Sequence, residues 1–297
     1  MDYSRIIEAV DIKLLQRTHI IVVGAGGSYS LVCSLARTGI GKITVLDFDT
    51  VEASNIVRQG YNQTDIGNYK VNALGKAVSQ INPDTEYLGI TKNFHDMNET
   101  ELDTIFKEAD LALFLTDSFK AQSFGNILAL KYMIPAIWAG FYAKSRTAEI
   151  FFSIPKYTPS CFRCCCSYRY LANKKEEIKV SSNCNTIFHS QHLDSFIGFI
   201  ALAILHKNHL KRKNDFEFAS FFQEMKNEDG KINYNFIQFK VHPLGGNKLF
   251  DNAFNNVGMN AQNFNSYWQR IEAEIPDNGY NTCPDCKGKL QQMIKEK

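Results

Sequence analysis

The chain lacks a charge bias, a long apolar run and a leader pattern at its N-terminus. It has 33 Lys and Arg against 31 Asp and Glu, so nothing global draws it to nucleic acid or to an anionic membrane. No run reaches the roughly 18 consecutive apolar residues of a membrane span. Asp2, Arg5, Glu8 and Asp11 make the N-terminus unlike a secretory signal. We therefore expect a cytoplasmic protein, with no nucleic acid and no membrane among its partners.

What the chain does have is enough apolar material for a large α/β domain or two modest ones, since 44% of its 297 residues are hydrophobic. His19–Val23 is a β-branched run, Gly24-Ala25-Gly26-Gly27 follows it directly, and a helical pattern continues through Leu31, Leu35 and Ala36. Such a turn lets a phosphate approach the backbone at a helix N-terminus. Alone, this pattern also fits a dinucleotide dehydrogenase or a plain tight turn.

Two further apolar runs end in polar residues. Lys42–Leu46 leads into Asp47-Phe48-Asp49, and Leu111–Leu115 leads into Thr116-Asp117. Ligands bind at the carboxyl edge of an open parallel sheet, where Asp47 suits an acid that accepts hydrogen bonds from ribose hydroxyls. A β-rich pair, near residues 134–138 and 147–154, closes the first half. We predict an α/β fold with a doubly wound, Rossmann-like, mostly parallel sheet.

The residues after Asp47 carry a more specific pattern. Residues 47 to 59 read DFDTVEASNIVRQ, and Asp65-Ile66-Gly67, Lys70 and Ile81-Asn82-Pro83 follow. With Thr116-Asp117 and two CxxC pairs, this closely resembles the nucleotide-binding signature of the ubiquitin-activating superfamily, the ThiF-, MoeB- and HesA-type adenylyltransferases. The resemblance covers most of residues 1 to 205 and the C-terminal tail.

The resemblance implies ATP-dependent adenylation of a carboxylate, a reaction that brings negative charges together. Fixed cations and a metal ion offset that charge, and no general base is needed because the carboxylate is already ionised near neutral pH. The implied ATP site comprises Gly24, Gly26 and Gly27 in the turn, Asp47 at the ribose, Asp49 near the phosphates, Asn55, Arg58 and Lys70 on the phosphates, Gln59 supporting that loop, and Asp117 holding Mg²⁺.

Plainer interpretations of these residues stay open. Arg58 and Lys70 could be surface charges, and Asp117 could be a helix N-cap. Tyr29 stands where the family usually has a further glycine, which puts the path of the phosphate loop in question. Family members often borrow an arginine from a neighbouring subunit, and Arg5 is the candidate here.

Four of the eight cysteines form two CxxC pairs, Cys161/Cys164 and Cys283/Cys286. A reducing cytosol disfavours disulfides, and four thiolates in two pairs are typical of a closed tetrahedral zinc site. We predict structural Zn²⁺ that ties the C-terminal tail to the domain, against redox-active or unliganded cysteines. The neighbouring Cys165 or Cys166 could substitute as a ligand.

Cys184 precedes an apolar helix that we expect from about Leu193 to Leu205. Several relatives have their thioester- or disulfide-forming cysteine there, and a thiol near a helix N-terminus can have a lowered pKa. It is therefore a candidate nucleophile for the adenylate, or an ordinary half-buried cysteine. His189 and His192 are interpreted as helix-surface residues.

The chain divides into an ATP-binding adenylation domain, residues 1–155, and a zinc-binding and crossover region, residues 156–297, with the cysteine segment and a partner-binding insertion at about 206–265. The resemblance implies a homodimer acting on a small ubiquitin-like or sulfur-carrier protein, with a conjugating enzyme or a sulfur donor downstream. Alternatives are adenylation of a peptide, a small carboxylate or tRNA, and a noncatalytic or NAD-binding Rossmann module.

Overall fold

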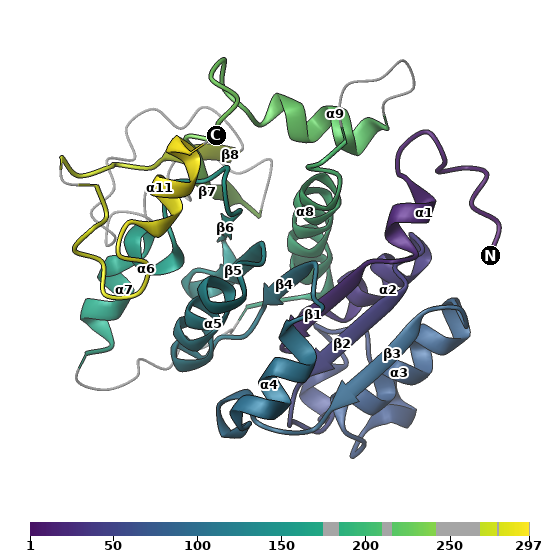
Figure 1. Ribbon diagram of the computed structural model, residues 1–297. Coiled ribbons are helices and arrows are strands. Elements are labelled where there is room, and N and C mark those ends of the chain that lie inside the picture. Colours follow the sequence, from purple (N-terminus) through teal and green to yellow (C-terminus); the bar gives the residue numbers. More distant parts are fainter. Residues whose placement is uncertain (175–183, 210–215, 242–267, 278, 297) are drawn as a thin grey trace.

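The computed structural model describes residues 1–174, 184–209, 216–241, 268–277 and 279–296 (Figure 1). One sheet of eight strands runs through them in the order β3-β2-β1-β4-β5-β6-β7-β8. The first five strands in this order are parallel to one another, and β6, β7 and β8 each pair antiparallel with the strand before them. The predicted mostly parallel α/β fold is confirmed. The strands are β1 His19–Val23, β2 Lys42–Leu46, β3 Glu86–Ile90, β4 Leu111–Phe114, β5 Ala136–Phe141, β6 Thr147–Ser153, β7 Tyr234–Lys240 and β8 Trp268–Glu272.

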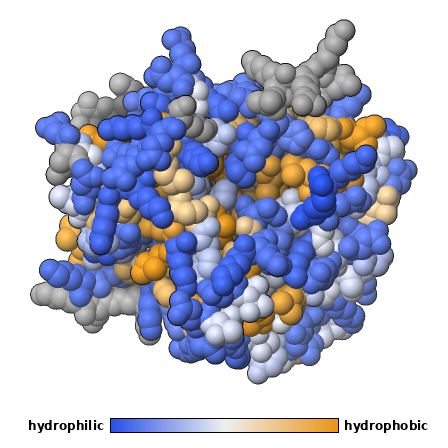
Figure 2. Space-filling model, in the orientation of Figure 1, coloured by the Kyte–Doolittle hydropathy of each residue, from blue (hydrophilic) through white to orange (hydrophobic). Residues whose placement is uncertain are grey.

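Helices cover both faces of the sheet, which is why its central strands read as continuous apolar runs. In β1, Ile20 and Val22 enter one core, and Ile21 and Val23 enter the other. The remaining surface is mostly hydrophilic on the face shown in Figure 2. The first core packs α2 (Tyr29–Arg37), α3 (Lys70–Ile81), α8 (Ile187–Leu205) and α9 (Glu217–Glu224), and the second packs α4 (Glu99–Phe106) and α5 (Phe119–Tyr132).

The helix expected from Leu193 begins earlier, at Ile187. A capping box between Thr186 and His189 begins the helix. Its first turns contain polar residues, so a search for apolar runs does not detect them as helical. Among the described residues, α8 is the one helix long and apolar enough to cross a membrane by length and composition. Half of its apolar window is buried, and it packs against α2.

Other boundaries differ by one to three residues from the sequence prediction. Strand β5 begins at Ala136, after Pro135, which has no N–H to donate to the sheet. Strands β3, β7 and β8 were not predicted. Because β7 and β8 continue the sheet, the sheet itself crosses the predicted boundary at residue 155. The division into two domains stays a prediction. Part of the 206–265 segment, residues 210–215 and 242–265, lies outside the described residues.

Three shorter helices complete the described part near the C-terminal tail, α6 (Phe162–Cys165), α7 (Ser167–Ala172) and α11 (Lys289–Lys295). A fourth, α1 (Ile12–Leu15), leads into β1. The tail lies beside α6, as Figure 1 shows, and a small separate core joins them through Cys161, Tyr280 and Leu290.

Candidate functional site

The glycine turn lies at the carboxyl edge of the sheet, between β1 and α2. Gly24 has a φ of +101°, and a Cβ there would lie 2.6 Å from the Leu115 carbonyl oxygen, so the turn requires glycine. A Cβ on Gly26 would lie 3.1 Å from Nε2 of Gln59, whereas one on Gly27 would meet nothing within 4 Å. The turn is therefore closed on the protein side and open at Gly27, where a phosphate could approach.

Asp47 follows β2 and is tied to the glycine turn. Its Oδ2 accepts a hydrogen bond from the Ala25 N–H at 2.7 Å, and its Oδ1 accepts one from the Asp49 N–H at 2.8 Å. Burial raises the pKa of Asp47, and the Ala25 hydrogen bond opposes that rise. Tyr61 donates to the Ala25 carbonyl at 2.7 Å. These contacts fix the carboxylate beside the turn, as a ribose-binding acid requires.

Lys70 is the first residue of α3 and is only 7% exposed, so it is not a surface charge. Its Nζ lies 2.7 Å from Oδ2 of Asp49, whose side chain is 51% exposed. The structure therefore holds a fixed ammonium beside a carboxylate that is half open to solvent. This arrangement suits a phosphate of ATP.

The loop from Asn55 to Gln59 forms the next wall. Asn55 is buried, and its Oδ1 accepts a hydrogen bond from the Glu52 N–H at 2.9 Å. Its carbonyl accepts from the N–H groups of Arg58 and Gln59. Among the described residues, the side-chain oxygen of Gln59 is buried without a hydrogen-bond partner. A buried oxygen without a hydrogen-bond partner beside the turn is typical of a site that binds a polar ligand.

Asp117 is exposed after β4, next to the glycine turn. The alternative that it caps α5 is wrong, because the N-cap is Ser118, whose Oγ accepts from the Ala121 N–H. An exposed carboxylate at this edge fits an Mg²⁺ ligand by its chemistry.

Tyr29 does not fill the turn. Its ring lies over Gly60, where a Cβ would be 2.1 Å from Cδ1 of the ring, and it packs edge-on against Tyr61 with centroids 4.7 Å apart. The bulk that replaces the family's glycine is thus accommodated by a glycine on the neighbouring loop. The turn keeps its opening at Gly27.

The two CxxC pairs meet, with all four sulfur atoms within 4.8 Å of one another. Sγ–Sγ distances are 3.6 Å for Cys161–Cys164, 3.8 Å for Cys161–Cys283 and 3.4 Å for Cys164–Cys286. Tetrahedral zinc with Zn–S bonds of about 2.3 Å separates its sulfurs by about 3.8 Å, so the cluster fits. Cys165 and Cys166 instead pack in the aromatic core beneath and are not part of this group.

Polar residues that sequence reasoning missed surround the cluster. Asn126 of α5 is buried, and its Nδ2 lies 3.7 Å from Cys161 Sγ and 2.7 Å from Asp285 Oδ2. Arg163 pairs with the other Asp285 oxygen at 2.9 Å. Asp285 lies between the two cysteines of the second pair, which is the one signal that could have found it. These bonds tie the tail to α5 and α6.

Cys184 is not part of the four-cysteine group. It is exposed, has a φ of +69°, and stands two residues before the N-cap of α8. The structure therefore corrects the half-buried alternative, while the role of nucleophile stays a prediction. His189 and His192 are both partly exposed on α8; His189 joins the capping box of the helix, and His192 packs on Phe239.

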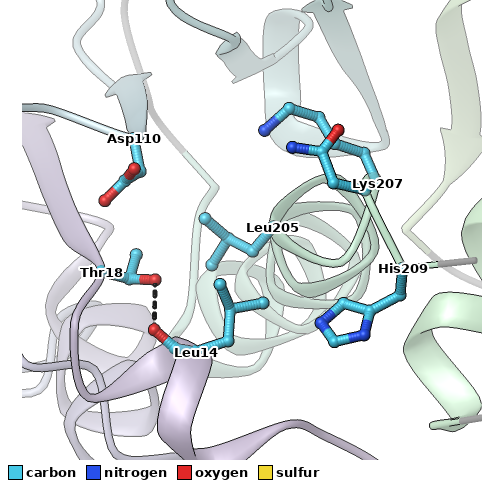
Figure 3. Close-up of a pocket in the computed structure, with 7 residues that line it drawn as sticks. Leu14, Thr18, Asp110, Leu205, Lys207 and His209 are labelled. Atoms are coloured by element: carbon cyan, nitrogen blue, oxygen red, sulfur yellow. Dashed lines mark hydrogen bonds between the residues drawn. The ribbon is translucent and has the colours of Figure 1, made fainter.

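A small cavity of about 160 Å³ lies at the opposite edge of the sheet (Figure 3). Thr18 and Asp110, just before β1 and β4, line one side, and Lys207 and His209, just after α8, line the other. None of the residues that line it belongs to the glycine turn.

Comparison with known proteins agrees with this arrangement. Probable adenylyltransferase/sulfurtransferase MoeZ of Mycobacterium tuberculosis is 30% identical over 143 residues, 47% of this chain and 35% of that protein. Molybdopterin-synthase adenylyltransferase of Escherichia coli is 30% identical over 157 residues, 51% of this chain and 60% of that protein. Escherichia coli MccB, solved with ATP, shares the fold with a TM-score of 0.58 at 18% identity, over 77% of this chain and 62% of that one.

The chain thus spans less than two thirds of the length of each of these proteins. The model of the ThiF family matches residues 3–237, from the segment before β1 into β7. That match includes the glycine turn, Asp47, Arg58, Lys70 and Asp117, and the chain is therefore a member of the ThiF family.

Proposed function

We propose that this chain is an ATP-dependent adenylyltransferase that activates the C-terminal carboxylate of a small ubiquitin-like or sulfur-carrier protein. The observation that carries the proposal is the buried Lys70, which pairs with the half-exposed Asp49, beside a glycine turn that is open at Gly27. ATP use is expected in this family, and both curated relatives described above are named adenylyltransferases.

The reaction follows from charge. A carboxylate oxygen attacks the α-phosphorus, a new O–P bond forms, and pyrophosphate leaves with the electrons of the broken bond. Arg58 and Lys70 offset the negative charge that builds up, while Asp47 orients the ribose. Asp117 would hold Mg²⁺, which supplies further positive charge at the phosphates. Catalysis is then chiefly positioning and electrostatics.

ATP–pyrophosphate exchange tests the proposal, because pyrophosphate must leave during adenylation and return in exchange. We expect exchange only with a carboxylate partner present, and its loss in Arg58→Ala and in Asp117→Ala. Unchanged exchange in both variants, or NAD-linked turnover, would contradict the proposal. A panel of glycine-ended ubiquitin-like proteins, short peptides, small carboxylates and tRNA identifies the class of partner.

The four-cysteine cluster supports a structural Zn²⁺ bound by Cys161, Cys164, Cys283 and Cys286. The sulfur geometry fits zinc, and the surrounding bonds join the tail to two helices. The metal would play no part in adenylation, because all four positions of a tetrahedral site are taken by sulfur.

Cys184 is proposed to take the activated acyl group. Its thiolate would attack the carbonyl carbon of the adenylate, form a thioester and release AMP. Exposure of Cys184 supports access. Cys184→Ser should keep pyrophosphate exchange but lose a thiol-sensitive adduct on a non-reducing gel. An adduct that persists would exclude Cys184, and no adduct in the wild type would favour direct use of the adenylate by a sulfur donor.

We also propose that the protein is a cytoplasmic homodimer. In this dimer, Arg5 of one subunit would reach the ATP site of the other. Arg5 is exposed in the monomer, as such a role requires. Light scattering tests the first, and exchange by mixtures of Arg5→Ala and Arg58→Ala subunits tests whether one subunit completes the site of the other.

A further inference from the structure

Helix α8 contacts both walls of the nucleotide site through two side chains that lie one turn apart. Ser190 donates a hydrogen bond from Oγ to the Arg58 carbonyl at 3.0 Å. Asp194 accepts one at Oδ2 from the Leu31 N–H, also at 3.0 Å. Residues four apart share a face of a helix, and both side chains are buried. One face of α8 thus connects the Arg58 loop to α2.

The Asp194 contact replaces a missing helix cap. Leu31 is the third residue of α2, where a backbone N–H has no partner within the helix. The N-cap residue Ser28 makes no side-chain cap bond, and its hydroxyl donates instead to the Gly24 carbonyl. Asp194 therefore supplies from α8 the acceptor that α2 lacks, directly behind the glycine turn.

The Ser190 contact acts on the opposite wall. The Arg58 carbonyl that it holds belongs to the loop whose Asn55 and Gln59 border the turn. Gly198, further along α8, has Leu31 Cδ1 3.6 Å from where its Cβ would be, so the helix packs closely on α2. Any displacement of α8 would change the spacing between the two walls.

We propose that Ser190 and Asp194 are positioning residues, which set the affinity for the phosphates of ATP by fixing the Arg58 loop against the first turn of α2. This inference rests on the proposed function, since it assumes that ATP binds at this edge. Neither residue belongs to the motif that carries the family resemblance. Burial raises the pKa of Asp194, and the hydrogen bond from the Leu31 N–H opposes that rise.

Calorimetric titration with Mg-ATP tests the inference without a protein partner. Ser190→Ala should weaken ATP binding about threefold to tenfold, the usual effect of one hydrogen bond. Asp194→Ala should weaken it about tenfold to a hundredfold, because it leaves a buried N–H unpaired. Asp194→Asn, which keeps an acceptor, should restore most of the affinity. Adenosine, which has no phosphate, should bind all variants as it binds the wild type.

Ser195→Ala is the matched control, since Ser195 is exposed on the same helix and donates only to the Gln191 carbonyl within it. It should bind ATP as the wild type does. A wild-type protein that does not bind ATP would contradict the proposed function itself. Wild-type binding with unchanged affinity in Ser190→Ala and Asp194→Ala would overturn only this inference, as would equal losses for ATP and adenosine.

Discussion

The edge of the sheet at the glycine turn, where we propose that ATP binds, is open to solvent, whereas the cysteine cluster is closed. At the nucleotide edge, Lys70 is buried but its partner Asp49 is half exposed, and Gly27 faces open space. At the cluster, four sulfur atoms face one another and a buried Asn126 closes the surroundings. A closed set of four ligands leaves no position for a substrate, whereas an open edge with fixed charges does. The two sites should therefore fail independently of each other.

The largest effect is expected at the cluster. Cys283→Ser should remove the zinc and loosen the tail, because structural zinc binding is worth about 10–16 kcal/mol in small domains. Metal analysis and thermal unfolding are the measurements, with Cys165→Ser as the control outside the ligand set. Full zinc content in Cys283→Ser, or a metal-free wild type of undiminished stability, would contradict the account.

At the proposed ATP site we expect the opposite pattern, with activity lost while zinc content and stability are kept. Lys70→Met keeps the apolar stem but removes the charge, and we expect exchange to fall about 10²–10³-fold, the usual effect of losing one stabilising group. Zinc content and unfolding temperature should stay near wild type. Lys76→Ala, exposed on the same helix, is the control. Retained exchange in Lys70→Met would place the phosphates elsewhere.

A smaller effect should follow from crowding the open edge. A Cβ on Gly60 would lie 2.1 Å from the Tyr29 ring, so Gly60→Ala should lower the free energy of unfolding by about 1–3 kcal/mol, as overpacking commonly does. Adding Tyr29→Ala should restore part of the lost free energy of unfolding. Denaturant unfolding of the two single variants and the double variant measures this as a double-mutant cycle. If the two changes simply add, the ring does not depend on Gly60.

The smallest effect concerns a region distant from both sites. His206 is fully buried, accepts the Asp11 N–H at Nε2 and contacts the Leu202 carbonyl through Nδ1. Burial is the main cause that lowers its pKa, and the hydrogen bond to the Leu202 carbonyl opposes it, with smaller effects of His209, which lowers the pKa, and Asp11, which raises it. Since the pKa is lower in the folded state, its stabilising effect is present above about pH 6.5 and is lost as the pH falls below that.

His206→Gln should therefore make the free energy of unfolding less dependent on pH between about 7.5 and 5. His189→Gln, which keeps the capping box of α8, serves as the control. An unchanged pH dependence in His206→Gln would contradict this prediction, and His19→Gln and His192→Gln would then be the next variants to measure, because burial lowers the pKa of both residues.

What the sequence could predict follows from local physics. Runs such as His19–Val23 are buried on both faces and need no tertiary information to be read as strands. The edge strand Glu86–Ile90 alternates between exposed and half-buried residues and contains Gly89, so it carried no strong signal. Strand β7 joins β6 only through pairing across a long stretch of chain, which no local pattern encodes.

The site divides in the same way. The motif residues Asp47, Arg58 and Lys70 could be identified from their order in the chain. Asn126, Ser190 and Asp194 could not, because their roles depend on helices that meet only in the folded protein. Polar residues buried inside apolar helices were the one available signal, and it does not say which partner satisfies them.

The most direct test follows an oxygen atom. A glycine-ended ubiquitin-like protein is labelled with oxygen-18 in its C-terminal carboxylate and incubated with this chain, Mg-ATP and a thiol acceptor. Mass spectrometry then measures the mass of the nucleotide product. Attack of the carboxylate on the α-phosphorus predicts AMP that carries one labelled oxygen, with release of pyrophosphate. Formation of ADP and phosphate, or of AMP without label, would contradict adenylation at this site.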